Sequence, residues 1–316
     1  MINKKAQMNF EVIFAIIVGG MILFLAIYGA MRFSDSSRKQ TDTEVAKKLS
    51  VLTNPMQAGF AESQSSKIIF NQETKLYNYC FAERFGKNDI AIATKSSVGE
   101  EWNVPGNKIA IYNKYLFSED IQQGKELWIF SKGFEFPYKV ADLIFLSMNR
   151  YCFVTDRSSK KIAEEVTSLK IENIKITESI ENCSEEEIKV CFGTKSGCEI
   201  EVFGSGEGDA YSEGYVQKDG KRMYYYGSLM YGAIFTNKEI YDCEVQRLLY
   251  RDARLAEIYL GKADLMNARG CNTNIVEDLK ILSINLGNAS ADDFLKLKES
   301  VKALDKKAKT ELCRTW

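Results

Sequence analysis

The chain has 316 residues, of which 45% are hydrophobic, and its formal net charge is −1. This length can form one large domain or two small ones with real cores, and the near-neutral charge argues against a nucleic-acid partner. The absence of histidine excludes Ser-His-Asp and Cys-His catalysis and imidazole metal ligands. No pair of catalytic carboxylates can be recognised in the sequence, so we expect no enzyme, no cofactor and no metal. A surface enzyme that acts through carboxylates is the weakest of the hypotheses.

The N-terminus carries Lys4 and Lys5, followed by an uncharged apolar run over 12–31. An α-helix rises about 1.5 Å per residue, so roughly 20 apolar residues cover a bilayer core of about 30 Å. No A-x-A-like cleavage site follows the run, as a secretory signal would need. The pattern predicts a retained transmembrane helix over 7–33 in contact with membrane lipid. The N-terminus would be cytoplasmic and the rest of the chain a single-pass ectodomain outside the cell membrane.

Residues 4–11 read Lys-Lys-Ala-Gln-Met-Asn-Phe-Glu. They resemble the class III signal peptide of archaeal type IV pilins and archaellins. The resemblance implies that a prepilin-type signal peptidase removes the leader 1–6 after Ala6, which makes Gln7 the first residue and Glu11 the fifth. It also implies that Glu11 enters the apolar bundle of a filament, where the α-amine of Gln7 on a neighbouring subunit meets its charge.

This resemblance ends near residue 33. Ala6 and Asn9 stand where glycine and serine are frequent in the family. Lysines before an apolar helix also follow from the positive-inside rule alone, which is the competing interpretation. Beyond the resemblance, an amphipathic stalk helix is expected over 34–60, because apolar residues recur there at helical spacing.

The segment 61–237 predicts the β-rich first half of the ectodomain. Short β-rich runs alternate with turn residues, and one helix is expected over 158–169. The runs are 67–70, 75–81, 89–93, 108–112, 126–130, 151–154, 174–176 and 188–192. Tyr224, Tyr225 and Tyr226 are an unusual run that could form a sugar- or protein-binding patch, although tyrosine is equally suited to a strand with one face in the core.

Eight cysteines, an even number, occur without any Cys-x-x-Cys pair. In an extracellular location they predict disulfide bonds rather than a zinc site. Their pairing stays open, because connectivity cannot be deduced from sequence alone. The eight are Cys80, Cys152, Cys183, Cys191, Cys198, Cys243, Cys271 and Cys313.

The last part, 238–316, predicts helices packed on the ectodomain. Apolar residues recur at helical intervals over 238–266 and 275–286, and Ser290 followed by two aspartates reads as the cap of a helix that runs to about residue 312. The predicted fold is therefore α+β, with a transmembrane helix, a stalk, and a disulfide-bonded ectodomain.

From the resemblance we expect a pilin-like cell-surface subunit, minor or adhesive, whose partners are like or related pilin subunits contacted through the N-terminal helix. The alternative is a single-pass membrane-tethered binding protein that does not polymerise. Filaments extracted from cells, or their absence, would distinguish the two.

Overall fold

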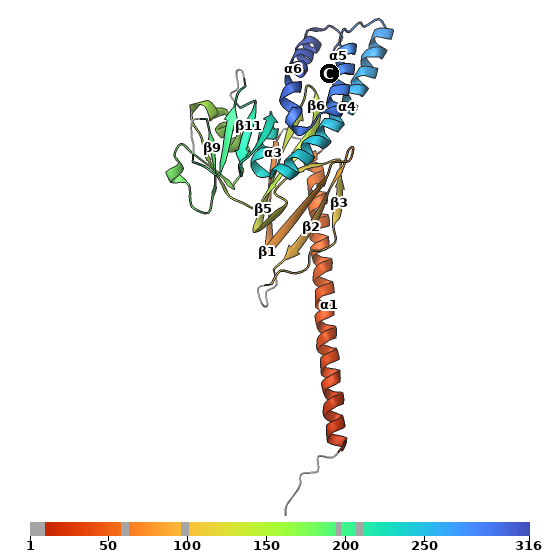
Figure 1. The fold of residues 1–316 in the computed structure, drawn as a ribbon, viewed down its shortest axis with the longest axis vertical. Coiled ribbons are helices and arrows are strands. Elements are labelled where there is room, and N and C mark those ends of the chain that lie inside the picture. The colour runs from red at the N-terminus through yellow and green to blue at the C-terminus, as the bar shows by residue number, and fades with distance from the viewer. Residues whose placement is uncertain (1–9, 58–62, 96–100, 194–196, 207–210) are drawn as a thin grey trace, which may run out of the picture.

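The computed structural model describes residues 10–57, 63–95, 101–193, 197–206 and 211–316. Within these ranges the fold is α+β, with two six-stranded sheets and four disulfide bonds. Figure 1 shows a head of sheets and helices from which one long helix extends. The predicted fold class is thus correct in its α+β content, and its N-terminal part needs a correction.

Helix α1 (Phe10–Gln57) is a single continuous helix of 48 residues. In the described part of the chain, no helix combines the length and apolar character that crossing a membrane requires. The predicted transmembrane helix over 7–33 is therefore wrong.

The first sheet has the strand order β3-β2-β1-β5-β6-β4. Its pairs are antiparallel except for the parallel pair of β4 and β6. The strands are β1 (Ser63–Phe81), β2 (Lys87–Thr94), β3 (Ile109–Tyr112), β4 (Tyr115–Phe117), β5 (Ile121–Glu135) and β6 (Lys139–Ser147). A separate apolar core lies between this sheet and α1, to which α1 contributes Ala46 and Leu49.

The second sheet has the order β12-β11-β10-β9-β7-β8. Strands β8, β7, β9 and β10 are parallel neighbours, and β10, β11 and β12 are antiparallel. The strands are β7 (Tyr151–Val154), β8 (Ile174–Thr177), β9 (Ile188–Phe192), β10 (Ile200–Gly204), β11 (Glu213–Lys218) and β12 (Lys221–Tyr226). Helix α2 (Lys160–Ser168) connects β7 to β8 and agrees with the helix expected over 158–169.

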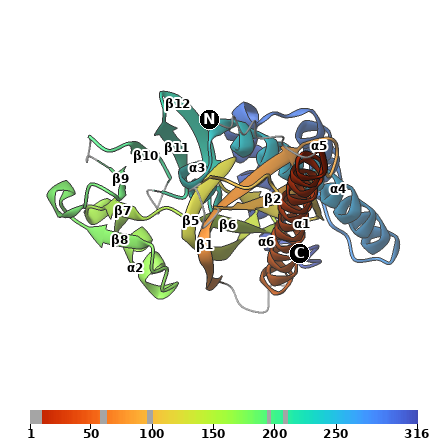
Figure 2. The same cartoon turned by 90° about the horizontal axis from the view of Figure 1, so that it is seen from below.

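The C-terminal helices complete the head. They are α3 (Leu229–Phe235), α4 (Lys238–Ala268), α5 (Val276–Asn288) and α6 (Phe294–Thr310). The predicted cap at Ser290 is present, because Ser290 and Asp293 form a capping box in the turn before α6. In Figure 2 the second sheet lies on one side of the first sheet and α1 on the other, while the large apolar core joins both sheets to α3–α6.

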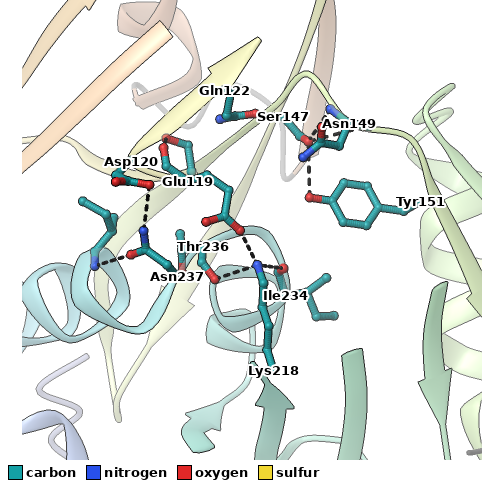
Figure 3. A network of polar contacts seen from close by, with 12 residues as sticks. Glu119, Asp120, Gln122, Ser147, Asn149, Tyr151, Lys218, Ile234, Thr236 and Asn237 are labelled. Carbon is teal, nitrogen blue, oxygen red and sulfur yellow. Dashed lines mark hydrogen bonds and ion pairs between the residues drawn. The ribbon is translucent and has the colours of Figure 1, made fainter. Parts of the chain in front are cut away.

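Polar contacts connect the second sheet to the first, as Figure 3 shows. Lys218 of β11 pairs with Glu119, which lies between β4 and β5. The same ammonium donates to the carbonyl oxygens of Ile234, at 3.3 Å, and Thr236, at 3.0 Å, at the end of α3. One partly buried lysine therefore connects both sheets and α3.

The eight cysteines form disulfide bonds, as predicted. The structure adds the pairing: Cys80–Cys243, Cys152–Cys183, Cys191–Cys198 and Cys271–Cys313. The bond from Cys80 to Cys243 spans 163 positions and attaches α4 to β1. Because the loop it closes is the longest of the four, it removes the most conformational freedom from the unfolded chain in the chain-entropy account.

Beside this disulfide, a fully buried arginine fastens α4 to the first sheet. Arg247 has an exposed fraction of 0% and pairs with Glu244 at 2.8 Å. Its guanidinium also donates to the Asn88 side chain at 2.6 Å and to the carbonyl oxygens of Phe85 and Lys114. Burial raises the pKa of Glu244 to about 7, and the Arg247 charge opposes that rise.

The turn between β1 and β2 is built around this guanidinium. Gly86 has a φ of +56°, and a Cβ there would lie 1.9 Å from the carbonyl oxygen of Phe81 and 2.9 Å from Arg247. Glycine is therefore required for both the backbone conformation and the space. Apart from Glu244, the hydrogen-bond partners of Arg247 are Phe85, Asn88 and Lys114, which lie 133 to 162 positions away from it in the chain.

We expect Arg247→Met to lower the free energy of unfolding by about 3–5 kcal/mol, because it leaves the Glu244 carboxylate buried without its charge partner. The double variant Glu244→Leu with Arg247→Met should recover much of that loss. Urea unfolding at neutral pH measures both. The control is Arg254→Met, which breaks the exposed pair with Glu257 at the same spacing in the same helix and should cost at most about 1 kcal/mol. Equal losses for Arg247→Met and Arg254→Met would contradict this account.

Candidate functional site

The first half of α1 is the most unusual surface of the molecule. Every residue from 13 to 29 is exposed, including Ile16 at 67% and Leu23 at 64%. The apolar side chains cover all sides of the helix rather than one stripe, a pattern found in helices that are buried. An exposed apolar surface of this extent marks an interaction site. The large side chains are Ile13, Phe14, Ile16, Ile17, Val18, Met21, Ile22, Leu23, Phe24, Leu25, Ile27 and Tyr28.

Small residues interrupt this apolar surface. A Cβ placed on Gly19, Gly20 or Gly29 would meet no atom within 4 Å. Ala15 lies four residues before Gly19, so the two fall on the same side of the helix. Small residues at this spacing let two helix backbones approach closely. The first half of α1 can therefore pack against other helices without a change in the head.

The second half of α1 is seated on the first sheet. Ala46 and Leu49 enter the apolar core with exposed fractions of 0% and 2%. Asp42 is also buried, and its carboxylate accepts hydrogen bonds from the Thr94 hydroxyl, at 3.1 Å, and the Thr94 amide, at 3.3 Å. The amide of Asn107 donates to the Thr43 hydroxyl at 2.9 Å. Apolar and polar contacts together hold the helix in one orientation.

The loop before β3 approaches α1 closely at Gly106. A Cβ on Gly106 would lie 2.9 Å from the backbone nitrogen of Thr43 and 3.2 Å from the carbonyl carbon of Asp42. These are backbone atoms of a helix, which cannot move aside as a flexible side chain can. Helix α1 can therefore pack this closely against the loop only because residue 106 has no side chain.

The residues predicted for processing fall largely outside the described structure. Lys4, Lys5, Ala6 and Gln7 precede the first described residue. The backbone of Glu11 belongs to the first turn of α1, and its side chain is not among those described. Their roles in cleavage and assembly stay predictions.

The three tyrosines of the predicted binding patch lie in different surroundings. Tyr225 is fully buried, and its hydroxyl donates to the carbonyl oxygen of Phe203 at 3.4 Å. Tyr226 packs edge to face on the buried Phe136, with 5.2 Å between ring centroids. Tyr224 is partly exposed on the opposite face of β12 from Tyr225. They do not present one common surface.

The carboxylate and cysteine side chains of the described residues are dispersed over the fold. No group of three or more aspartate, glutamate or cysteine side chains there could hold a metal ion. Asp252 is a buried carboxyl with an exposed fraction of 1% that interacts with the Tyr138 hydroxyl, but neither of its carboxylate oxygens forms a hydrogen bond of ordinary geometry with a described residue. Burial raises the pKa of Asp252 well above its usual value.

Two groups of residues escape the sequence-based predictions. Glu244 and Arg247 are three apart on α4, a spacing that is common on exposed helix faces, so nothing local distinguishes a buried pair. The second group is Lys75, Tyr77 and Tyr79 of β1. Their alternation could have predicted a shared surface of tyrosine and lysine side chains, because alternate residues of a strand lie on one face.

No family model, curated protein or solved structure matches this chain. Its function therefore has to be argued from its own residues. The two halves of α1, one exposed and apolar and the other fixed to the head, form the candidate functional site.

We expect Gly106→Val to loosen the seat of α1, because the added side chain collides with helix backbone. Hydrogen–deuterium exchange of amides over 42–49 should become faster, while exchange in α4 stays unchanged. The control is Gly261→Ala in α4, where a Cβ meets nothing within 4 Å. Unchanged exchange over 42–49 in Gly106→Val would show that the close approach does not matter.

A second prediction concerns pH. Because the folded pKa of Asp252 is raised, the folded state keeps a proton that the unfolded state releases, and this carboxyl lowers stability as pH rises above about 4. Asp252→Asn removes this contribution, so its gain over the wild type in the free energy of unfolding, measured with urea, should be larger at pH 8 than at pH 4.5, by about 1.4 kcal/mol for each unit of pKa shift within that range. Asp264→Asn, an exposed position on the same helix, is the control. A gain that is equal at both pH values would contradict the prediction.

Proposed function

We propose that this chain is a subunit of a cell-surface filament of the type IV pilin-like kind, assembled through the first half of α1. The observation that carries the proposal is the division of one continuous helix. Residues 13–29 are apolar and exposed on all sides, whereas Asp42, Ala46 and Leu49 are buried in the head. A filament core made of such helices would cover the exposed half and display the heads outside.

The free energy of burial supports assembly of like helices. Burying one large apolar side chain contributes about 1.5–3 kcal/mol relative to its exposed state. The exposed half of α1 carries twelve large apolar side chains between residues 13 and 28. A helix that is apolar on every side needs neighbours on every side, and several copies of the same helix in a bundle provide them.

The N-terminal pattern supports the same proposal from the sequence. Cleavage by a prepilin-type signal peptidase after Ala6 would make Gln7 the first residue of the chain and Glu11 the fifth. In the resembled family these two residues join neighbouring subunits. A head with two six-stranded sheets is large for a main repeating pilin, which favours a minor or adhesive subunit.

The alternative hypothesis was a membrane-tethered binding protein that never polymerises. The exposed apolar half of α1 is better used in contacts between subunits, so the filament is the function that we adopt.

We expect Leu23→Glu to abolish filaments, because it places a carboxylate in the middle of the apolar contact surface. The head should unfold at the same temperature as in the wild type, since Leu23 is exposed and far along the helix from the seat of α1. The matched control is Ile284→Glu, which adds the same charge at an exposed isoleucine of α5. Electron microscopy of material released from native cells measures how many filaments each variant forms.

N-terminal sequencing of the same filaments completes the test. A chain that begins at Gln7 is the expected result. Normal filaments from Leu23→Glu, or wild-type chains that all retain residues 1–6, would overturn the proposal.

A further inference from the structure

A strip of aromatic and lysine side chains lies on the outer face of the first sheet, away from α1. We call it the aromatic–lysine strip. It consists of Lys75, Tyr77, Tyr79 and Phe81 of β1, Tyr112 of β3, and Lys108 just before β3. The strand register brings them together: Phe81 pairs with Lys87, which pairs with Tyr112, and Tyr79 pairs with Asp89, which pairs with Ala110.

The two faces of β1 are sharply different. Leu76 and Asn78 point into the molecule with exposed fractions of 0% and 1%, whereas Tyr79 and Phe81 on the other face are 36% and 44% exposed. Tyr112 is 61% exposed. A solvated sheet face normally carries polar side chains, so a row of partly exposed aromatic rings needs an explanation.

The lysines of the strip are held against aromatic rings. The Nζ atom of Lys108 lies 3.8 Å from the ring centroid of Tyr79, and that of Lys75 lies 4.2 Å from the ring centroid of Trp102. Such cation–π contacts fix the position of the ammonium group and leave its hydrogen-bond donors available.

The charges of these two lysines are not neutralised by the described part of the protein. Lys87, on the same face, pairs with Asp89 at 2.9 Å. Neither Lys75 nor Lys108 forms an ion pair with any described carboxylate. Two fixed cations between exposed rings are therefore free to meet an anionic ligand.

We propose that the aromatic–lysine strip binds an acidic polysaccharide. The rings offer flat apolar faces to the C–H faces of the sugar rings, and the ammonium groups of Lys75 and Lys108 bind the carboxylates. The small number of positive charges favours this ligand over a nucleic acid. A nucleic acid presents one phosphate about every 3.4 Å along each strand and needs many cations, whereas the strip has two in a chain of net charge −1.

The test uses the full-length chain in a non-ionic detergent and measures binding by isothermal titration calorimetry. The ligand is a set of alginate oligomers, which are polymers of uronic acid. We expect alginate to bind and neutral dextran of the same length not to bind. The double variant Lys75→Gln with Lys108→Gln should weaken alginate binding by about tenfold or more, since it removes two charge-assisted contacts.

Tyr112→Ala tests the stacking surface at a position too exposed to hold the fold together, and it should also weaken binding. Lys306→Gln, at an exposed position on α6, is the matched control and should bind as the wild type does. Circular dichroism melting confirms that each variant is folded.

Three results would overturn the proposal. The first is no alginate binding, or alginate binding that the double lysine variant leaves unchanged. The second is equal binding of polyglutamate, which has the carboxylates and no sugar ring. The third is tighter binding of a single-stranded oligonucleotide than of alginate.

Discussion

The head of this protein depends on one buried charge. Arg247 on α4 reaches into the first sheet, where it contacts β2 and the loops around Phe85 and Lys114, and Glu244 balances its charge. Burying an ion pair is costly, so such a pair stabilises the fold only when the surrounding groups satisfy its hydrogen bonds. Here they do, and the Cys80–Cys243 bond holds the same two elements together covalently. The helical part and the first sheet consequently behave as one unit.

That unit gives α1 a fixed base. The second half of the helix packs on the same sheet that Arg247 ties to α4, through Ala46 and Leu49 in the core and Asp42 on Thr94. The exposed first half therefore leaves the head at a defined angle rather than from a loose hinge. A regular filament requires this, because every head must sit on the core in the same way. The aromatic–lysine strip lies on the face of the sheet opposite α1, so assembly through α1 would leave it available.

The helices of the C-terminal part could be predicted with small errors. The expected segments 238–266 and 275–286 correspond to α4 (Lys238–Ala268) and α5 (Val276–Asn288), because apolar periodicity and capping residues are local signals. The transmembrane helix was the main error: the apolar composition at the N-terminus suggested a span that the described helix does not provide. The tyrosine run shows a different limit, since strand alternation buried Tyr225 in the core and left Tyr224 and Tyr226 partly exposed on the other face of β12.

The sequence by itself determined the α+β content, the use of the cysteines in disulfides, and the contrast between an apolar N-terminal segment and a head with both polar and apolar residues. Each of these depends on composition or on short-range periodicity. Only the tertiary structure decided which cysteines pair, that Glu244 and Arg247 are buried, that Gly106 must lack a side chain, and that two lysines of the outer sheet face form no ion pair with a described carboxylate. These features arise where segments far apart in the chain meet. Local propensity contains no information about such meetings, because the partner of each residue is set by the packing of the whole fold.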